Sequence, residues 1–298
     1  MVAVSQARIF SVLALGIFAA SFASILIRLT PAPALVIAAG RMLFATIILT
    51  PFFLNRPHLR KNELGRTKLP FVLLAGIFLA AHFGFWIESL SHTTVASSVV
   101  LVAMNPIFVA LFSPFLLKEK PSLRLYLAIG LGVIGALIIN RPVLNSASSL
   151  TGNLLALLGA LFAALYVIIG RKLRPGLSLL GYVYPVYLVA ALILLIIAFV
   201  AGYPLTSYPL KTYFFILLLA IGPQIIGHTS FNWALGYLPA PVVAMTILGE
   251  PVGTTILAAI ILRQAPTWFE LIGGAIILCA IYLAGLSFSQ DKKTGAPV

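Results

Sequence analysis

Residues 178–201 read SLLGYVYPVYLVAALILLIIAFVA and contain no charged side chain over 24 positions. Apolar and polar residues do not alternate here, so the period of two that marks a half-buried strand is missing. A helix of about 20 residues crosses the hydrocarbon core of a bilayer and satisfies its own backbone hydrogen bonds there. The stretch is therefore predicted to form a transmembrane helix.

Similar apolar stretches recur along the whole chain. Of its 298 residues, 61% are hydrophobic and only 8% are charged, whereas soluble proteins have roughly 25% charged residues. The mean hydropathy is +1.13. The sequence predicts an all-α integral membrane protein of ten transmembrane helices, without a separate soluble domain. The ten stretches lie at about residues 9–28, 32–54, 69–90, 93–117, 123–140, 151–170, 178–201, 212–234, 238–262 and 267–287.

The first stretch is longer than the apolar region of a signal peptide and is interpreted as a retained first helix. The single cysteine, Cys279, excludes an internal disulfide and any cysteine-based zinc site. No cluster of His, Cys and Asp has the spacing of metal ligands. Neither a metal nor a cofactor is expected.

The formal net charge of +13 is interpreted as a signal of membrane orientation. Alternate loops hold fourteen and four basic residues, which predicts a multi-pass protein of the cytoplasmic (inner) membrane with both termini in the cytoplasm. Nucleic-acid binding is not expected, because these charges sit in short loops. The fourteen are Arg8, Arg56, Arg60, Lys61, Arg66, Lys68, Lys118, Lys120, Arg124, Arg171, Lys172, Arg174, Lys292 and Lys293, and the four are Arg28, Arg141, Lys211 and Arg263.

The chain repeats itself weakly at an offset of 145 residues. Asn105-Pro106 in the fourth stretch then corresponds to Glu250-Pro251 in the ninth. We expect a five-helix repeat at 1–143 and a second at 144–298, together forming one bundle. Because five is odd, the second repeat enters the membrane inverted, as in many secondary transporters.

Several segments resemble the EamA family of the drug/metabolite transporter superfamily. They are HFGFWIESLSHTTVASS at 82–98, Asn105-Pro106, Lys118-Glu119, GHTSFNWAL at 227–235 and Gly249-Glu250-Pro251. The resemblance implies ten helices in two inverted repeats, with a substrate path between the first four helices of each half. It also implies that the fifth and tenth helices are peripheral. One residue departs from the family's pattern, because the acid that commonly ends the ninth helix is Gln264, whereas the first half has Glu119.

Five polar residues fall near the middle of five different apolar stretches: Arg41, His82, Asn105, Gln224 and Glu250. Such residues are costly inside a membrane and mark transport pathways. If their helices surround one cavity, they form a polar belt near the bilayer midplane. The alternative is structural, with Arg41 paired to Glu250 and the other three joining helices by hydrogen bonds.

Glu250 is the candidate proton carrier. Desolvation favours its neutral form and a nearby cation favours its ionised form, so it can exchange a proton. Trp86 shares a helical face with His82, as His228 does with Gln224, and these aromatic rings are predicted to line the pathway.

Prolines inside the apolar stretches predict kinks. Gly222 and Pro223 interrupt the eighth stretch, while Pro106 and Pro251 occupy corresponding places in the fourth and ninth. Each proline removes a helical donor and frees a carbonyl group one turn earlier. We expect hinges at these four residues, whereas Pro185 fits equally well with a packing kink.

The pattern Gly130-x-Gly132-x-x-Gly135 matches a dinucleotide-binding fingerprint, but no strand precedes it, so it is interpreted as helix packing. The chain has neither a phosphate-binding loop for ATP nor a set of catalytic residues, so it is not expected to be an enzyme. The predicted function is a secondary transporter that moves a small polar or amphipathic metabolite across the cytoplasmic membrane by alternating access. Amino-acid-like compounds are the favoured substrate class and export is the favoured direction, with proton coupling and a homodimer left open. The alternatives are an uptake carrier or exchanger for nucleotides, vitamins or sugars, and a membrane enzyme or lipid scramblase.

Overall fold

A computed structural model of the chain describes residues 4–56, 65, 67–93, 95–139, 150–261, 263 and 265–294. The predicted boundary between the two repeats, at 143/144, lies outside the described residues, as does Gln264. The same holds for four of the loop cations used to predict the orientation: Arg60, Lys61, Arg66 and Arg141.

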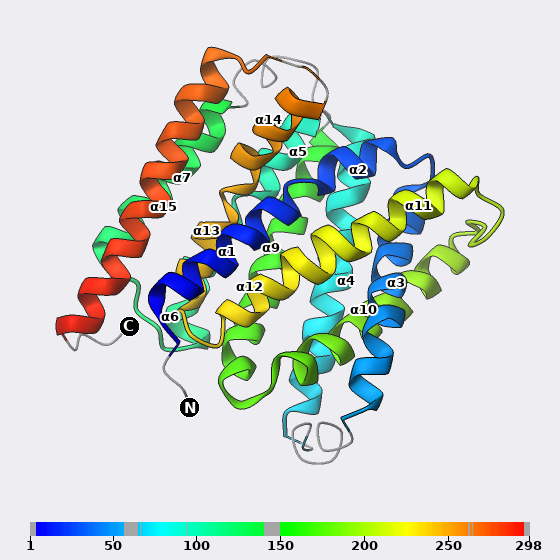
Figure 1. Cartoon of the computed structure of the whole chain (residues 1–298), viewed down its shortest axis with the longest axis horizontal. Coiled ribbons are helices and arrows are strands. Elements are labelled where there is room, and N and C mark those ends of the chain that lie inside the picture. The colour runs from blue at the N-terminus through cyan, green and yellow to red at the C-terminus, as the bar shows by residue number, and fades with distance from the viewer. Residues whose placement is uncertain are drawn as a thin grey trace.

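The regular elements of the described residues are all helical, and Figure 1 shows them packed into one bundle. The elements before residue 140 are α1 (Gln6–Ala20), α2 (Ala23–Leu29), α3 (Ala34–Leu54), α4 (Leu69–His92), α5 (Val95–Val102), α6 (Asn105–Leu116) and α7 (Leu123–Ile139). Those after residue 149 are α9 (Leu150–Leu173), the short 3-10 helix η2 (Arg174–Gly176), α10 (Leu179–Val200), α11 (Leu210–Leu219), the π-helix η3 (Ala220–His228), α12 (Thr229–Ala234), α13 (Ala240–Ile247), α14 (Glu250–Ile261) and α15 (Trp268–Thr294).

Nine helical segments of the described chain are long and apolar enough to cross a membrane. Some of them join successive elements, such as Gln6–Leu29, which contains α1 and α2. The remaining apolar helix, α7, has 17 residues and is roughly 26 Å long at 1.5 Å per residue, close to the hydrocarbon thickness of a bilayer. The prediction of an all-α membrane protein with ten spans is confirmed.

Two of these spans are broken directly before their prolines. α5 ends at Val102 and α6 begins at Asn105, while α13 ends at Ile247 and α14 begins at Glu250. Pro106 and Pro251 are thus the second residues of α6 and α14, where a missing N–H costs no helical hydrogen bond. The two prolines begin new helices rather than kink continuous ones.

The sequence offset of 145 is also an offset of local structure. The starts of α3, α5, α6 and α7 at residues 34, 95, 105 and 123 are matched by the starts of α10, α13, α14 and α15 at 179, 240, 250 and 268. The broken fourth span therefore recurs, residue for residue, as the broken ninth span.

Helix packing places the fifth and tenth spans at the edge of the bundle. α4 packs along α9, α10 packs against α3 and α4, and α1 packs against η3 and α12. In contrast, α7 and α15 run side by side along one edge of the molecule (Figure 1). This agrees with the peripheral position that the family resemblance implies.

Two glycines bring the backbones of α7 and α15 into contact. A Cβ atom at Gly273 would lie 2.5 Å from the carbonyl oxygen of Gly135, and a Cβ atom at Gly135 would lie 2.8 Å from the carbonyl oxygen of Gly273. No Cβ atom fits at either distance without moving a helix. Gly135 of the G-x-G-x-x-G pattern is therefore a packing residue, as predicted.

We predict that Gly273→Ala lowers the stability of the detergent-solubilised protein by about 1–3 kcal/mol, because the added methyl group overpacks a backbone contact. Gly130→Ala is the matched control, since a Cβ atom at Gly130 meets nothing within 4 Å. The control is expected to be neutral or slightly stabilising. Thermal unfolding followed by fluorescence measures both variants, and equal stability of the two would contradict the prediction.

Candidate functional site

A cavity of about 80 Å³ lies between helices from both halves of the chain. It has room for a few water molecules. Among the described residues, none of those that line it belongs to α7, α10, α11 or α15. The lining residues are Ala20, Ala23, Ser24, Arg41, His82, Trp86, Val99, Val102, Ala103, Asn105, Ala163, Tyr166, Val167, Pro223, His228, Phe231, Asn232, Leu235, Ile247, Glu250, Pro251 and Thr254.

Most of the residues predicted from the sequence meet at this cavity. Arg41, His82, Trp86, Asn105, His228 and Glu250 line it, together with the candidate hinges Pro223 and Pro251. Gln224 lies behind Arg41 and binds it. Pro106 and Gly222 are not among the lining residues. The helices that carry the polar belt thus surround one space.

Arg41 is a fully buried cation whose hydrogen bonds are incomplete. Its Nη2 donates to Oε1 of Gln224 at 2.8 Å, and its Cζ lies 4.1 Å from the ring centroid of Phe83. Its Nε and Nη1 have no hydrogen-bond partner in the described structure. A buried charge is costly unless it is paired, so the guanidinium is available to an anionic group in the cavity.

Glu250 provides the opposite charge. It is the first residue of α14 and lines the same cavity as Arg41. The ion pairs within 4 Å in the described residues are Glu88–His92 and Arg171–Glu119. The direct Arg41–Glu250 pair that the structural alternative assumed is therefore not formed. A cation and a carboxyl group face the same cavity without touching.

Aromatic rings form one wall of the cavity. The His82 and Trp86 rings are stacked, with centroids 5.9 Å apart, as their shared helical face predicted. The His228 ring lies 5.2 Å from that of Phe83 and 6.0 Å from that of Phe231. These distances are typical of favourable ring contacts, so the wall is a continuous cluster rather than separate membrane anchors.

His82 is held in one orientation by the neighbouring helix. Its Nδ1 lies 2.9 Å from the carbonyl oxygen of Gly159 on α9. A carbonyl oxygen only accepts, so Nδ1 carries the hydrogen of this bond. A Cβ atom at Gly159 would lie 3.1 Å from Cβ of Trp86. Glycine therefore allows α9 close enough to α4 to make this contact.

Three amide side chains have atoms that the protein leaves unpaired. Oδ1 of Asn105, Nε2 of Gln224 and Oδ1 of Asn232 are buried without a partner in the described structure, as is Nε1 of Trp86. Nδ2 of Asn232 donates to the Tyr166 hydroxyl at 2.5 Å and to the carbonyl oxygen of His228 at 2.8 Å. Buried polar atoms without partners are rare in folded proteins, and most of those named here belong to residues that line one cavity.

The eighth span differs from its prediction. Gly222 and Pro223 do not interrupt the helix, which widens instead into the π-helix η3. The carbonyl oxygen of Gln224 accepts from the hydroxyls of Tyr187 and Thr229, each at 3.4 Å. Side-chain donors thus occupy a carbonyl group in the widened segment. Such π-segments often occur at functional sites.

The seventh span also differs from the arrangement that the resemblance implies. α10 contributes no lining residue in the described chain. Its Tyr187 is fully buried and approaches η3 from behind, at Gln224 and Thr229. α10 therefore supports the residues that hold Arg41, while other helices form the cavity wall.

Neither Tyr166 nor Phe83 was predicted from the sequence to be a site residue. Tyr166 lies inside an ordinary apolar stretch, and Phe83 is one of 20 phenylalanines. The available signal was the offset of 145, which pairs Phe83 with His228 and Trp86 with Phe231. Trp86, His228 and Phe231 line the cavity, and Phe83 packs against the His228 ring.

The bundle and its central polar cavity define a multi-pass membrane protein of the transport type. The profile of the EamA-like transporter family matches residues 7–141 and 150–286, and the chain belongs to this family. The family and the relatives described next are named as transporters, which indicates membrane transport.

The chain is 27% identical over 285 residues to an uncharacterized transporter of Archaeoglobus fulgidus, covering 94% of this chain and 97% of the relative. It is also 27% identical over 234 residues to the pseudopaline exporter CntI of Pseudomonas aeruginosa, covering 77% and 78% of the two chains. A protein of known crystal structure superposes with a TM-score of 0.77 at 18% identity, covering 96% and 99% of the two chains. That likeness shows the shared fold.

We predict that the double variant Arg41→Met/Gln224→Leu is at least as stable as the unmodified protein. Replacing a buried, incompletely paired charge and its partner with apolar side chains is often neutral or stabilising. Arg41→Met alone is expected to be less stable than the double variant, because it leaves the Gln224 amide unpaired. Thermal unfolding in detergent measures this, and a double variant that unfolds well below the unmodified protein would show that Arg41 is a structural residue.

Proposed function

We propose that this protein is a secondary transporter of the cytoplasmic membrane that exports a small amino-acid-like zwitterion by alternating access. Arg41 binds the carboxylate of the cargo and Glu250 binds its ammonium group or a proton. Asn105 and Gln224 orient the cargo, and His82, Trp86 and His228 line its path. Both termini lie in the cytoplasm.

The observation that carries this proposal is the pair of opposite charges that face one cavity without contact. Arg41 keeps two nitrogens unpaired, and Glu250 lines the same space. A zwitterion supplies a carboxylate and an ammonium group at once, so it pairs with both Arg41 and Glu250. A neutral sugar leaves both unpaired, and a nucleotide brings more negative charge than Arg41 balances, which is the one Lys or Arg among the described lining residues.

Alternating access is supported by the repeated local structure. The helix starts that recur after 145 residues agree with two five-helix repeats at 1–143 and 144–298. The cavity is lined by residues from both halves. A rocking motion of one repeat against the other would expose such a cavity to each side in turn. The breaks before Pro106 and Pro251 are where we place the hinges.

Export and orientation rest on two further observations. One relative is named as an exporter. The uneven distribution of lysine and arginine between alternate loops favours cytoplasmic termini. In the described residues, Arg8, Lys118, Lys120 and Arg171 belong to the basic side.

We predict that Arg41→Gln reduces counterflow of the zwitterionic cargo at least roughly tenfold, the loss expected when a charged hydrogen-bond partner is removed. Proteoliposomes preloaded with unlabelled amino acids and exposed to radiolabelled ones measure this exchange. Lys211→Gln is the matched control, because Lys211 is an exposed cation outside the cavity. Absence of exchange by the unmodified protein with every zwitterion tested would overturn the proposed function.

We predict that Glu250→Gln weakens exchange at equal pH, because an amide does not balance the ammonium group of the cargo, and abolishes uphill transport driven by an imposed pH gradient, because an amide cannot carry the proton. Glu88→Gln is the control, since Glu88 pairs with His92 at the surface, 3.0 Å away. Uptake into proteoliposomes with and without a pH gradient separates the two effects. Unchanged gradient-driven transport by Glu250→Gln would exclude it as the proton carrier.

A further inference from the structure

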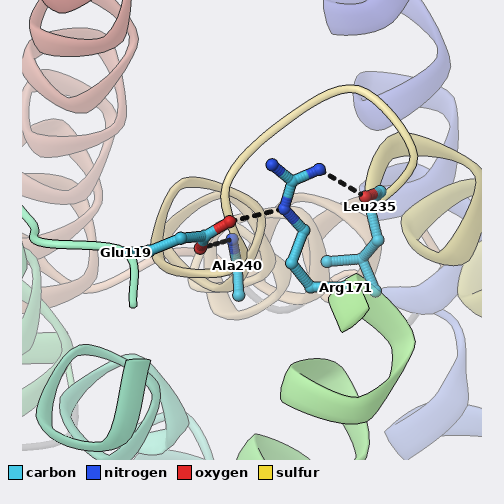
Figure 2. A network of polar contacts seen from close by, with 4 residues as sticks. All are labelled: Glu119, Arg171, Leu235 and Ala240. Carbon is cyan, nitrogen blue, oxygen red and sulfur yellow. Dashed lines mark hydrogen bonds and ion pairs between the residues drawn. The ribbon is translucent and has the colours of Figure 1, made fainter. Parts of the chain in front are cut away.

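A polar network joins the first half of the chain to the second at one end of the bundle (Figure 2). Oε1 of Glu119 accepts from Nε of Arg171 at 2.6 Å, and Oε2 of Glu119 accepts from the backbone N–H of Ala240 at 3.1 Å. Nη1 of Arg171 donates to the carbonyl oxygen of Leu235 at 3.1 Å. Glu119 is buried, with 8% of its surface exposed.

These contacts use the unpaired backbone groups of two helix ends. Ala240 is the first residue of α13, and its N–H has no partner within its own helix. Leu235 directly follows α12, so its carbonyl group is also outside the helical ladder. A carboxylate at a helix N-terminus and a cation at a C-terminus are both favourable. Glu119 and Arg171 therefore fix the two ends of the connection between α12 and α13.

The connection that they fix is part of the cavity wall. Leu235 lines the cavity, as does Asn232 one turn earlier. Nε of Arg174 donates to the carbonyl oxygen of Asn232 at 2.8 Å, and the side chain of Asn232 donates to the Tyr166 hydroxyl on α9. α9 and η2 thus contact this wall at several points, and Glu119 connects it to the loop that follows α6.

The corresponding end of the repeat cannot form the same ion pair. At the offset of 145, Glu119 corresponds to Gln264, and Arg171 corresponds to Leu26. Neither Gln264 nor Leu26 is charged, so the ion pair is absent from the sequence on that side. At the Glu119 end, an ion pair joins the two halves of the chain. The matched residues at the other end cannot form that ion pair.

We propose that Glu119 and Arg171 form a latch that closes one mouth of the cavity, and that each transport cycle must open it. This rests on the proposed transport function. The latch positions the Asn232–Leu235 wall and does not contact the cargo. Because the matched residues of the other repeat, Leu26 and Gln264, carry no charge, the latch favours the state that is closed at the Glu119 end over the state that is closed at the opposite end.

The test measures access to the cavity without any cargo. In a Cys279→Ser background, Ala163→Cys places a single thiol in the cavity wall, since Ala163 lines the cavity on α9. A membrane-impermeant thiol reagent is then added to either side of oriented vesicles. A separate Lys120→Cys protein identifies the Glu119 side, because Lys120 is exposed next to the latch.

The expected result is one-sided. Glu119→Gln should speed labelling of the thiol introduced by Ala163→Cys from the Glu119 side by roughly five- to tenfold, and it should slow labelling from the opposite side. The reason is that the population shifts from the state closed at the Glu119 end to the state closed at the opposite end. Glu119→Asp keeps the charge and should restore slow labelling. Glu88→Gln, which removes a surface ion pair, should leave the labelling rate unchanged.

Two results would overturn the latch. One is unchanged labelling from the Glu119 side in a folded Glu119→Gln protein, and the other is equally faster labelling from both sides, which indicates loosened packing. If Glu119→Gln does not fold, Arg171→Lys gives the same comparison, since it weakens the contacts to Glu119 and Leu235 while keeping the charge. The rates do not depend on the identity of the cargo, so a failed transport assay and a failed latch are distinguishable.

Discussion

The guanidinium of Arg41 is buried in the centre of the bundle, where one hydrogen bond to Gln224 and the ring of Phe83 leave two nitrogens unpaired. Several of the surrounding elements position the residues that contact this guanidinium. The π-helix η3 carries Gln224, and Tyr187 on α10 holds η3 in place from behind. A buried cation with free donors is costly to a fold and useful to a binding site. We propose that a cargo carboxylate bound in the adjacent cavity, which Glu250 also lines, offsets that cost.

Four helix starts of the described chain recur at a fixed offset, but several side chains at the matched positions differ. Helix starts recur at an offset of 145 residues, and Trp86 and Phe231 occupy equivalent places in the cavity wall. The polar residues break this relation, because Asn105 is matched by Glu250 and Glu119 by Gln264. A symmetric frame suits a two-state rocking motion, whereas unlike side chains give the two states different energies. We therefore attribute the rocking motion to the repeated helices. We attribute the preferred direction of transport to the positions where the two halves carry different side chains.

The ten spans were predictable because a length of about 20 apolar residues is set by the bilayer itself. The breaks before Pro106 and Pro251 followed from the missing N–H of proline. The π-helix around Pro223 was not predictable from the sequence. A helix can widen as well as break at a proline, and the packing of neighbouring helices determines which occurs. The lining of the cavity also depends on how each helix is rotated in the bundle. For that reason Tyr166 was missed, and α10 lies behind the site. The latch joins residues far apart in sequence, and only the resemblance drew attention to Glu119.

The central claim is that the cavity binds a zwitterion between Arg41 and Glu250. Equilibrium binding of a radiolabelled amino acid to the purified protein, competed by its deaminated acid and by its decarboxylated amine, tests this most directly. We expect the intact amino acid to compete best, and we expect the loss of either charged group to weaken binding at least roughly tenfold, because Arg41 or Glu250 is then left unpaired. Equal competition by the acid, the amine and the amino acid would contradict it.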